Sequence, residues 1–261
     1  MLAADLPGAG VVVTGAGSGI GAALAKRLAA AGARVVVNDI DASAAAAVAA
    51  EAGGTAIPAD AASEWGVAEL VSLARDHLGE IDLYCANAGV AVGGRQDAPE
   101  PDWEQAWQVN VMAHVRAARL LLGPWLDRGS GHMIATVSAA GLLTMLGAAP
   151  YSVTKHAALG FAEWLSATYR HRGITVQALC PQGVRTPMLA ATGETGRLIL
   201  GDSAIEPEQV ADAVMEALGD GRFLILPHPE VAQMYAGRAA DTDRWLRGMN
   251  KIQRRIEDAV P

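Results

Sequence analysis

A short apolar run, a glycine-rich turn and a helix-forming run follow one another near the start of the chain. Val11–Thr14 is β-branched, Gly15–Gly21 reads GAGSGIG, and Ala22–Ala31 is rich in Ala and Leu. A helix that begins directly after a buried strand presents backbone N–H groups and its positive dipole end to an anion. Glycine is needed there because a Cβ would block the turn or the ligand. An ordinary tight turn is the alternative, but the strand–turn–helix order favours a pyrophosphate site.

The alternation of short apolar runs with helical stretches continues along the chain. Expected strands are Val11–Thr14, Arg34–Asn38, Thr55–Pro58, Ile81–Ala86, His132–Val137, Thr175–Cys180 and Phe223–Leu226. Expected helices are Gly19–Ala31, Ala42–Ala52, Glu64–Leu78, Trp103–Leu126, Ser152–Arg172 and Pro207–Leu218. These helices supply the crossovers that parallel strands need. The pattern predicts one doubly wound α/β domain over residues 1–261, with a substrate lid at about 186–206 and a tail at about 227–261.

Composition excludes several classes of function. The net charge is -8 and no run of five basic residues occurs, so a nucleic-acid partner is not expected. The sequence shows neither a signal peptide nor an apolar stretch of about 18 residues, which indicates a cytoplasmic protein without a membrane partner. No metal site is predicted. Cys85 and Cys180 end strands expected to lie about 9–10 Å apart, beyond the roughly 7 Å reach of a disulfide, so both are expected to be buried free thiols.

An acidic residue follows the second expected strand. Asp39 comes directly after Arg34–Asn38, where a carboxylate can accept hydrogen bonds from the adenosine ribose and repel a 2′-phosphate. The alternative is that Asp39 caps the next helix, but Asp41 and Ser43 are better placed for that. The sequence therefore favours NAD over NADP.

Tyr151 and Lys155 stand four residues apart at the start of an expected helix, so their side chains share one face. An ammonium group and a positive nicotinamide both stabilise a phenolate, which lets the pair exchange a proton with an alcohol or carbonyl oxygen. Ser138 ends the fifth expected strand, at the edge where open α/β sheets bind ligands. A solvated Tyr–Lys pair and a turn-forming serine are the alternatives.

Taken together, these residues resemble the short-chain dehydrogenase/reductase family. The matching motifs are Thr14-Gly15-x-x-x-Gly19-Ile20-Gly21, Asn87-Ala88-Gly89, Asn110, Ser138, Tyr151-x-x-x-Lys155 and Pro181-x-Gly183. The resemblance runs from about Gly10 to Leu226. It implies a Rossmann-type sheet of seven strands in the order 3-2-1-4-5-6-7, and hydride transfer between NAD and an alcohol or ketone.

The resemblance also implies roles for individual residues. Asn110, Ser138, Tyr151 and Lys155 match the catalytic tetrad: Tyr151 as general acid/base, Ser138 on the substrate oxygen, Lys155 on the nicotinamide ribose, and Asn110 holding a water that links Lys155 to solvent. The residues assigned to the cofactor are Gly15, Ser18, Gly19, Ile20, Asp39, Asp60, Ala61, Asn87, Ala88, Gly89, Tyr151, Lys155, Pro181, Gly183, Val184 and Thr186. Among them, Asp60 would receive the adenine amino group and Thr186 would contact the carboxamide. Two residues depart from the family pattern. Ala61 stands where the family usually has Val, and Gln182 lies between Pro181 and Gly183, where the family usually has Pro-Gly.

Apolar residues surround the expected substrate position. Leu142, Leu143, Met145 and Leu146 follow Ser138, and the lid supplies Met188, Leu189 and Leu198. The predicted substrate contacts are Ser138, Leu142, Leu146, Gln182, Met188 and Leu189. The nearest cations are Arg185 and Arg197, so we expect a small, apolar, uncharged alcohol or ketone. An ordinary core is the alternative for these residues.

Two long helices carry apolar or small residues on more than one face. Around Ser152–Arg172, residues such as Ala157, Ala158 and Gly160 would let another subunit approach closely. Similar enzymes form tetramers through these helices, and Phe223–Leu226 with the tail around Trp245 resembles a second contact, so a homotetramer is expected. The alternative is a monomer whose tail covers the helices. Two rival functions are a nucleotide-sensing scaffold, which an intact tetrad disfavours, and an epimerase or dehydratase of the related longer family, which the glycine spacing disfavours.

Overall fold

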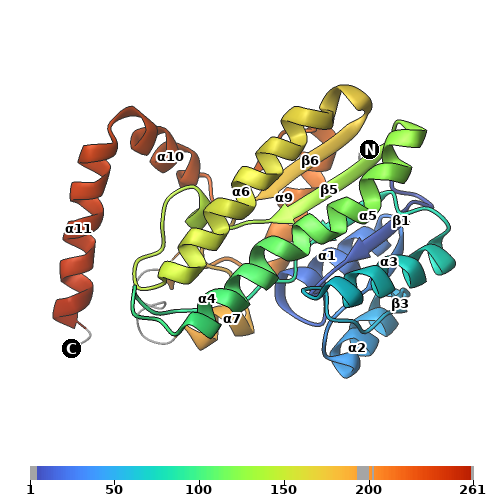
Figure 1. Ribbon diagram of the computed structural model, residues 1–261, viewed down its shortest axis with the longest axis horizontal. Helices are drawn as coiled ribbons and strands as arrows, with labels where there is room; N and C mark the ends of the chain where they lie inside the picture. The colour runs from blue at the N-terminus through green and yellow to red at the C-terminus, as the bar shows by residue number, and fades with distance from the viewer. Residues whose placement is uncertain (1–4, 193–199, 202, 260–261) are drawn as a thin grey trace.

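A seven-stranded parallel sheet forms the centre of the computed structural model, which describes residues 5–192, 200–201 and 203–259 (Figure 1). The strand order is β3-β2-β1-β4-β5-β6-β7, as the family resemblance implied. The strands are β1 (Gly10–Val13), β2 (Arg34–Val37), β3 (Thr55–Ala56), β4 (Leu83–Ala86), β5 (Gly131–Thr136), β6 (Ile174–Leu179) and β7 (Leu224–Ile225). All six neighbouring pairs are parallel, so every strand ends at the same edge of the sheet.

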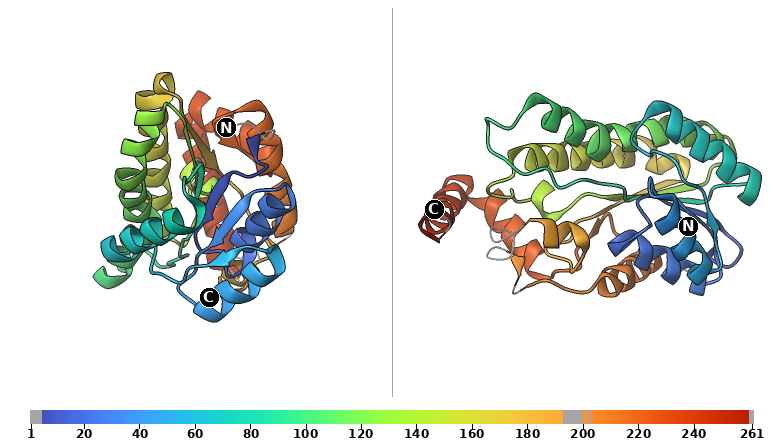
Figure 2. Two further views of the ribbon diagram at one scale, coloured as in Figure 1. Left: turned by 90° about the vertical axis from the view of Figure 1, so that its right-hand side faces the viewer. Right: turned by 90° about the horizontal axis from the view of Figure 1, so that it is seen from below.

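Helices cover both faces of this sheet. They are α1 (Gly19–Ala30), α2 (Ala42–Ala52), α3 (Glu64–Leu78), α4 (Glu100–Trp107), α5 (Ala113–Arg128), α6 (Ala149–Tyr169), α7 (Pro187–Ala191), α9 (Pro207–Asp220), α10 (Glu230–Ala240) and α11 (Thr242–Ala259). Figure 2 shows α5 and α6 on one side of the sheet and α1 and α9 on the other. Alternate residues of β1 belong to two cores, Val12 to the α3–α5–α6 side and Val11 and Val13 to the α1–α2–α9 side. Burial on both faces explains why the strands read as continuous apolar runs.

The helix expected over Trp103–Leu126 is divided in the structure. A π-helical turn, Gln108–Met112, separates α4 from α5 and contains Asn110. Such turns occur often at functional sites, because the wider turn redirects side chains. The helix expected over Ser152–Arg172 begins earlier, at Ala149, and has Pro150 in its first turn, where a missing N–H costs nothing.

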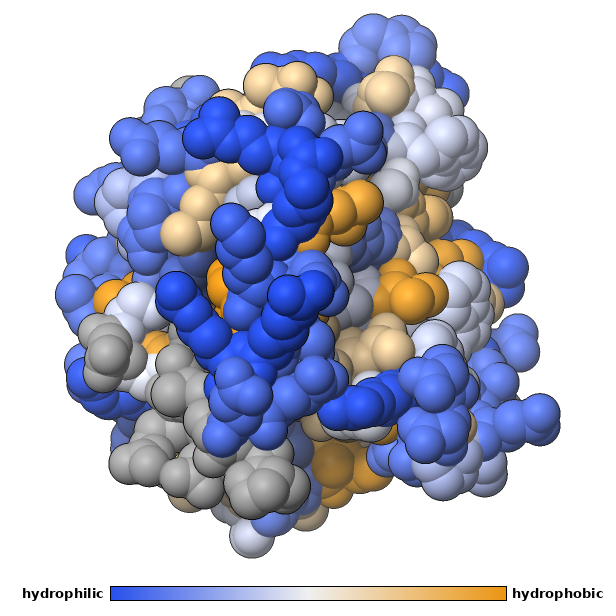
Figure 3. All heavy atoms as spheres, turned by 90° about the vertical axis from the view of Figure 1, so that its left-hand side faces the viewer, coloured by the Kyte–Doolittle hydropathy of each residue, from blue (hydrophilic) through white to orange (hydrophobic). Residues whose placement is uncertain are grey.

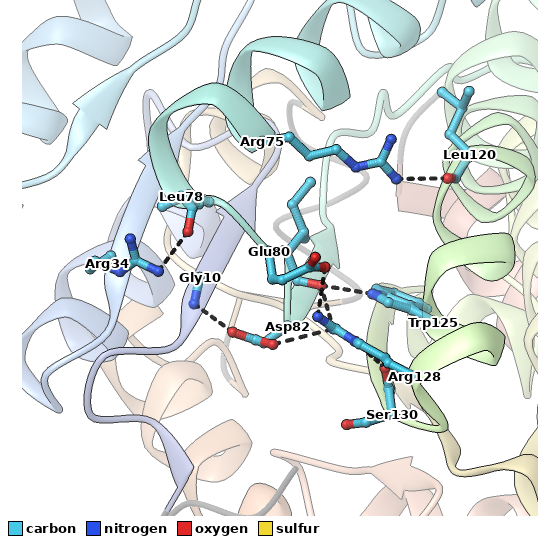
Figure 4. Close-up of polar contacts among 11 residues, drawn as sticks. Gly10, Arg34, Arg75, Leu78, Glu80, Asp82, Leu120, Trp125, Arg128 and Ser130 are labelled. Carbon is cyan, nitrogen blue, oxygen red and sulfur yellow. Dashed lines mark hydrogen bonds and ion pairs between the residues drawn. The ribbon is translucent and has the colours of Figure 1, made fainter.

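Polar contacts link the elements at the end of the sheet where the strands begin, opposite the end where they all finish (Figure 4). Asp82 accepts a 2.8 Å hydrogen bond from the backbone N–H of Gly10 and lies 3.2 Å from the Arg128 guanidinium. Arg128 also pairs with Glu80 at 2.8 Å, and the Trp125 indole donates to the Ile81 carbonyl at 2.7 Å. These contacts hold the end of α5 against β1 and β4, and they leave the other edge free for ligands.

The structure agrees with the expectations for the two cysteines and for the cap of α2, and it contradicts the one for Ala158. Cys85 and Cys180 are buried and free, as predicted. Asp41, not Asp39, caps α2 by accepting hydrogen bonds from the N–H groups of Ser43 and Ala44. Ala158 is buried in the core, so it does not face a neighbouring subunit. Within the described residues, no helix is both long and apolar enough to cross a membrane.

The tail contains two helices that sequence patterns did not identify. Arg238 of α10 donates hydrogen bonds to the carbonyls of Leu142 and Leu143 and lies 3.1 Å from Nε2 of His156. α10 is thereby fixed to the loop after β5 and to α6. α11 lies at one end of the α/β body and follows α10 in the chain (Figures 1 and 2).

Candidate active site

A cavity of about 440 Å³ lies at the carboxyl edge of the sheet. It reaches from Asp39 and Asp60, past the start of α1, to Tyr151 and Lys155. Every residue predicted to bind the cofactor lines it except Gly183. Several further residues line the cavity, although no sequence motif indicated them: Asn38, Ile40, Ala59, Val90, Gln105, Val109 and Thr136.

The start of α1 is suited to hold a pyrophosphate. Ser18 is the N-cap residue, its side chain makes no capping hydrogen bond, and the first turn carries no acidic residue. Gly19 has a φ of 52°, and a Cβ on it would lie 2.9 Å from the Thr186 side chain. The first-turn N–H groups and the helix dipole therefore remain available to an anion, so this part of the cavity fits a dinucleotide.

The Asn87-Ala88-Gly89 segment is held against β1. Oγ1 of Thr14 accepts hydrogen bonds from the backbone N–H groups of Asn87 and Ala88, both at 3.0 Å. Nδ2 of Asn87 donates to the carbonyls of Thr14 and Gly15, and Oδ1 accepts from Thr136. This network fixes the floor of the cavity between β1, β4 and β5.

Two carboxylates line the same cavity away from Tyr151. Oδ2 of Asp39 accepts from the N–H of Gly17 and Oδ1 accepts from the N–H of Asp41. Oδ1 of Asp60 accepts from the N–H of Ala62 at 2.9 Å. Backbone contacts thus hold both carboxylates at this end of the cavity.

Ser138 and Tyr151 meet beyond the end of β5. The Ser138 backbone has a φ of 150°, which is strained for a residue with a side chain, and its Oγ accepts from the N–H of Ala140 at 3.1 Å. Burial raises the pKa of Tyr151, and a hydrogen bond with Ser138 partly opposes this rise. In this environment the phenol is protonated, so it can donate to a carbonyl oxygen.

Lys155 lies under the Tyr151 ring, with Nζ 5.6 Å from the ring centroid. Nζ donates to the Thr136 carbonyl at 3.0 Å, which leaves two of its three donors free. Burial lowers the pKa of Lys155 to about 8, so the ammonium form persists at neutral pH but loses its proton readily.

The Asn110 side chain faces the loop after β4. Its Oδ1 accepts from the N–H of Val90 and its Nδ2 donates to the Val90 carbonyl, both at 3.0 Å, and also to Thr154 at 3.1 Å. These three bonds use both N–H donors of the amide and one of the two acceptor positions of Oδ1. Asn110 therefore braces the loop beside Lys155, which is a structural task that the sequence alone did not indicate.

A second, wider cleft of about 1350 Å³ opens on the other side of Tyr151. Of the predicted substrate contacts, Ser138, Leu146, Gln182, Met188 and Leu189 line it. Leu142 does not: its side chain is buried in the core, because the chain turns inward directly after the short helical turn at Ala139–Gly141. Leu198 and Arg197 lie outside the described residues, as does much of the expected lid.

Two residues outside the predicted set shape this cleft. The backbone N–H of Gln182 donates to Nδ1 of His228 at 3.1 Å, and Nε2 of the same ring lies 3.2 Å from the Ser203 carbonyl. His228 is buried and joins the segment at Gln182 to the segment before α9. Trp245, expected at a subunit contact, is partly buried against the protein's own core and lines the cleft.

The sequence model of the family described as short chain dehydrogenase matches residues 9–196. The chain belongs to the short-chain dehydrogenase/reductase family. It is 41% identical over 237 residues to a 1-deoxy-11-beta-hydroxypentalenate dehydrogenase from Streptomyces exfoliatus, covering 84% of this chain and 82% of that one. It is 30% identical to human epidermal retinol dehydrogenase 2, over 83% of this chain and 73% of that protein.

A solved structure of the same family agrees with this assignment. A short-chain dehydrogenase/reductase from Burkholderia phymatum, crystallised in complex with NAD, superposes with a TM-score of 0.84 at 28% identity, covering 92% of this chain and 95% of that one. As a short-chain dehydrogenase/reductase, the protein is an oxidoreductase that acts on alcohol groups with a nicotinamide dinucleotide. The fit of the 440 Å³ cavity to such a cofactor agrees with this assignment.

Proposed function

We propose that the protein interconverts a secondary alcohol and a ketone with NAD(H), with Tyr151 as general acid/base. One observation carries this proposal: Ser138 and Tyr151 line both cavities. A nicotinamide in the first cavity and a carbinol carbon in the second would meet beside these two hydroxyls. That placement suits hydride transfer coupled to proton transfer.

Residues of the chain itself transfer the proton. The bound nicotinamide would supply the acceptor or donor for the hydride. In the direction of oxidation, Tyr151 as phenolate removes the proton of the alcohol oxygen; in reduction, the phenol returns it to the carbonyl oxygen. Ser138 donates a hydrogen bond to that oxygen, and the Lys155 ammonium stabilises the phenolate. Asn110 keeps the loop beside Lys155 in place.

The Asp39 carboxylate supports NAD over NADP. It lies in the cofactor cavity, where its charge repels a 2′-phosphate. Among the described lining residues, Lys155 is the only lysine or arginine, and it belongs to α6 rather than to the part of the cavity around Asp39. Nothing in this lining therefore neutralises a phosphate beside the ribose.

An uncharged, apolar substrate suits the second cleft. The charged residues that line it have no excess of positive charge, with two basic residues, Arg95 and Arg244, against three acidic ones, Glu230, Asp241 and Glu257. Arg95 is paired with Glu257 at 3.6 Å. Two relatives are named for alcohols: retinol is uncharged and consistent with this substrate class, whereas hydroxypentalenate also carries a carboxylate.

A homotetramer built through α5 and α6 is also part of the proposal. Val153, Ala157, Gly160 and Trp164 lie on one outer face of α6. Val153 is 49% exposed and Trp164 is 55% exposed, so the described tail does not cover this face. A partner helix would bury it.

The activity can be tested by mixing purified protein with NAD⁺ or NADP⁺ and a panel of secondary alcohols while following the absorbance of the reduced nicotinamide. We expect turnover with NAD⁺ and much weaker turnover with NADP⁺. Reduced cofactor that appears equally without alcohol, or no turnover with any alcohol or ketone, would contradict the proposal.

A further inference from the structure

The wide cleft is bounded on one side by α11, which presents to it an apolar stripe flanked by the polar residues Arg244, Gln253 and Glu257. Trp245, Met249, Ile252 and Ile256 are spaced by four, three and four residues, so they share one face of the helix, and all four line the cleft. Arg247, Lys251, Arg254 and Asp258 repeat the same spacing on the opposite face, and none of them lines the cleft. α11 is therefore oriented with its hydrocarbon side toward Tyr151.

The surface view agrees with this orientation. Figure 3 looks onto the end of the molecule that carries α11, and it shows a column of hydrophilic side chains with hydrophobic patches beside it. The charged side of the helix meets solvent. An outward docking surface for a membrane would need the reverse arrangement, with the apolar side outward.

Both ends of α11 are attached to the body, and its middle is not. At the start, Trp245 packs against the core, and Arg238 fixes the preceding helix to Leu142 and Leu143. Toward the end, Ile256 is only 9% exposed and Glu257 pairs with Arg95. Between these attachments, Met249 is half-buried and Ile252 is exposed, although both face the cleft. Apolar side chains in this position remain hydrated until something apolar fills the space.

The volume of the cleft indicates what that occupant is. Pockets for small molecules typically measure about 300–1000 Å³, and this cleft measures about 1350 Å³. A simple secondary alcohol would occupy only a small part of this cleft, which is lined both by Ser138 and Tyr151 and by α11. A substrate that reaches both must carry a large hydrocarbon body.

We propose that α11 is a specificity element: its apolar face covers the hydrocarbon body of a bulky alcohol or ketone, of the size of two or more fused rings or a long chain, whose reacting carbon lies at Tyr151. This proposal rests on the proposed dehydrogenase activity and replaces the small substrate expected from the sequence with a large one. Met249 and Ile252 bind the part of the substrate that is remote from the reaction. Such remote contacts favour bulky substrates by lowering the barrier to reaction.

The test compares a double variant, Met249→Ala with Ile252→Ala, with Leu246→Ala. Leu246 lies on the same helix, is 58% exposed and does not line the cleft, so its truncation is a matched control. The readout is the ratio of kcat/KM for a decahydronaphthol to kcat/KM for cyclohexanol. We expect the double variant to lower this ratio roughly tenfold or more, since several buried methylene groups are lost, and the control to leave it unchanged. An equal ratio in all three proteins would overturn the proposal.

Binding separates this proposal from the proposed activity. A decahydronaphthalenone is titrated calorimetrically into the NADH complex of Tyr151→Phe, with and without the double substitution. Weaker binding with the double substitution supports the role of α11 even if no alcohol is turned over, whereas unchanged binding overturns it. A fall in molar mass of the double variant, measured by light scattering, would also overturn it, because α11 would then bind a second copy of the chain instead of substrate.

Discussion

Oδ2 of Asp39 accepts a 2.8 Å hydrogen bond from the backbone N–H of Gly17. The residue at the end of β2 is thereby fixed to the glycine turn after β1. A Cβ at Gly17 would lie 2.8 Å from the same oxygen, so a side chain there would displace the carboxylate. The position of the Asp39 carboxylate therefore depends on a glycine at residue 17.

Replacing Asp39 with Ala should erode discrimination against NADP. The loss of the negative charge removes the repulsion of a 2′-phosphate, so the ratio of the two dissociation constants should fall by about tenfold or more. Calorimetry with NADH and NADPH measures this ratio. Asp41→Ala is the control, because Asp41 caps α2 and does not line the cavity. Tighter binding of NADPH by the unmodified protein would disprove the role of Asp39.

Tyr151→Phe should lower kcat about 10²–10⁴-fold, the usual contribution of general acid/base catalysis. The affinity for NADH should change little, since the variant keeps the ring and loses only the hydroxyl. Stopped-flow turnover and fluorescence titration of NADH measure the two quantities. A variant that keeps most of its kcat would show that another group transfers the proton.

Ser138→Gly should unfold at a higher temperature than Ser138→Ala. Both lose the hydroxyl that accepts from Ala140 and that serves the substrate oxygen, so both should be nearly inactive. Glycine adopts a φ of 150° without strain, whereas alanine does not. The strain is of order 1–3 kcal/mol, and the flexibility of glycine in the unfolded chain offsets part of it, so about 1 kcal/mol should remain. Calorimetric melting of the two variants measures the difference, and equal stability would mean that the backbone is not strained there.

His114→Leu should make stability less sensitive to acid. His114 is buried, and burial together with the nearby Lys155 charge lowers its pKa to about 3, against a smaller opposing effect of the Ala86 backbone. The unfolded chain binds a proton near pH 6.5 that the folded chain does not bind until about pH 3. The free energy of unfolding therefore falls as pH decreases through this window, by up to about 1.4 kcal/mol per pH unit.

Urea unfolding at several values between pH 7 and pH 4 measures this slope in the wild type and in His114→Leu. His77→Leu, which replaces an exposed histidine at the end of α3, is the comparison. Parallel slopes in wild type and His114→Leu would contradict the prediction.

Trp164→Glu should dissociate the proposed tetramer, because it places a charge in the middle of the exposed face of α6. Trp65→Glu is the control: Trp65 is 80% exposed on α3, which is not part of the proposed contact. Light scattering after size exclusion gives the masses. A wild-type mass near 26.9 kDa would disprove the tetramer itself.

Most of the cofactor cavity could be predicted from sequence, because it depends on local signals. The glycine turn after β1, Asp39 after β2 and Tyr151–Lys155 on one helix turn all combine residue type with spacing. The strand order came from the family resemblance, since no local pattern specifies which strands are neighbours.

Contacts between distant segments could not be predicted. Leu142 reads as a cleft residue by its position after Ser138, but the chain turns inward there and buries it. His228 accepts a hydrogen bond from Gln182, which lies 46 residues away in the sequence, and nothing in the sequence around either residue indicates this contact. α11 does have a clear amphipathic pattern, at Trp245, Met249, Ile252 and Ile256, and a count of its helical spacing would have identified it.

The π-helical turn at Gln108–Met112 limits insertions and deletions in the helical segment that runs from α4 into α5. A turn of this kind holds one residue more than the α-helical turn that it replaces, and each residue of a helix rotates the next by about 100°. The extra residue sets the rotational phase of α5, in which His114, Ala117 and Leu121 are buried against the sheet. A deletion of one residue between α4 and α5 would give a more regular helix, yet it would turn this stripe away from the core. Gaps in the sequences of relatives should therefore fall in the surrounding loops and avoid this helix, even though it lies on the outside of the molecule.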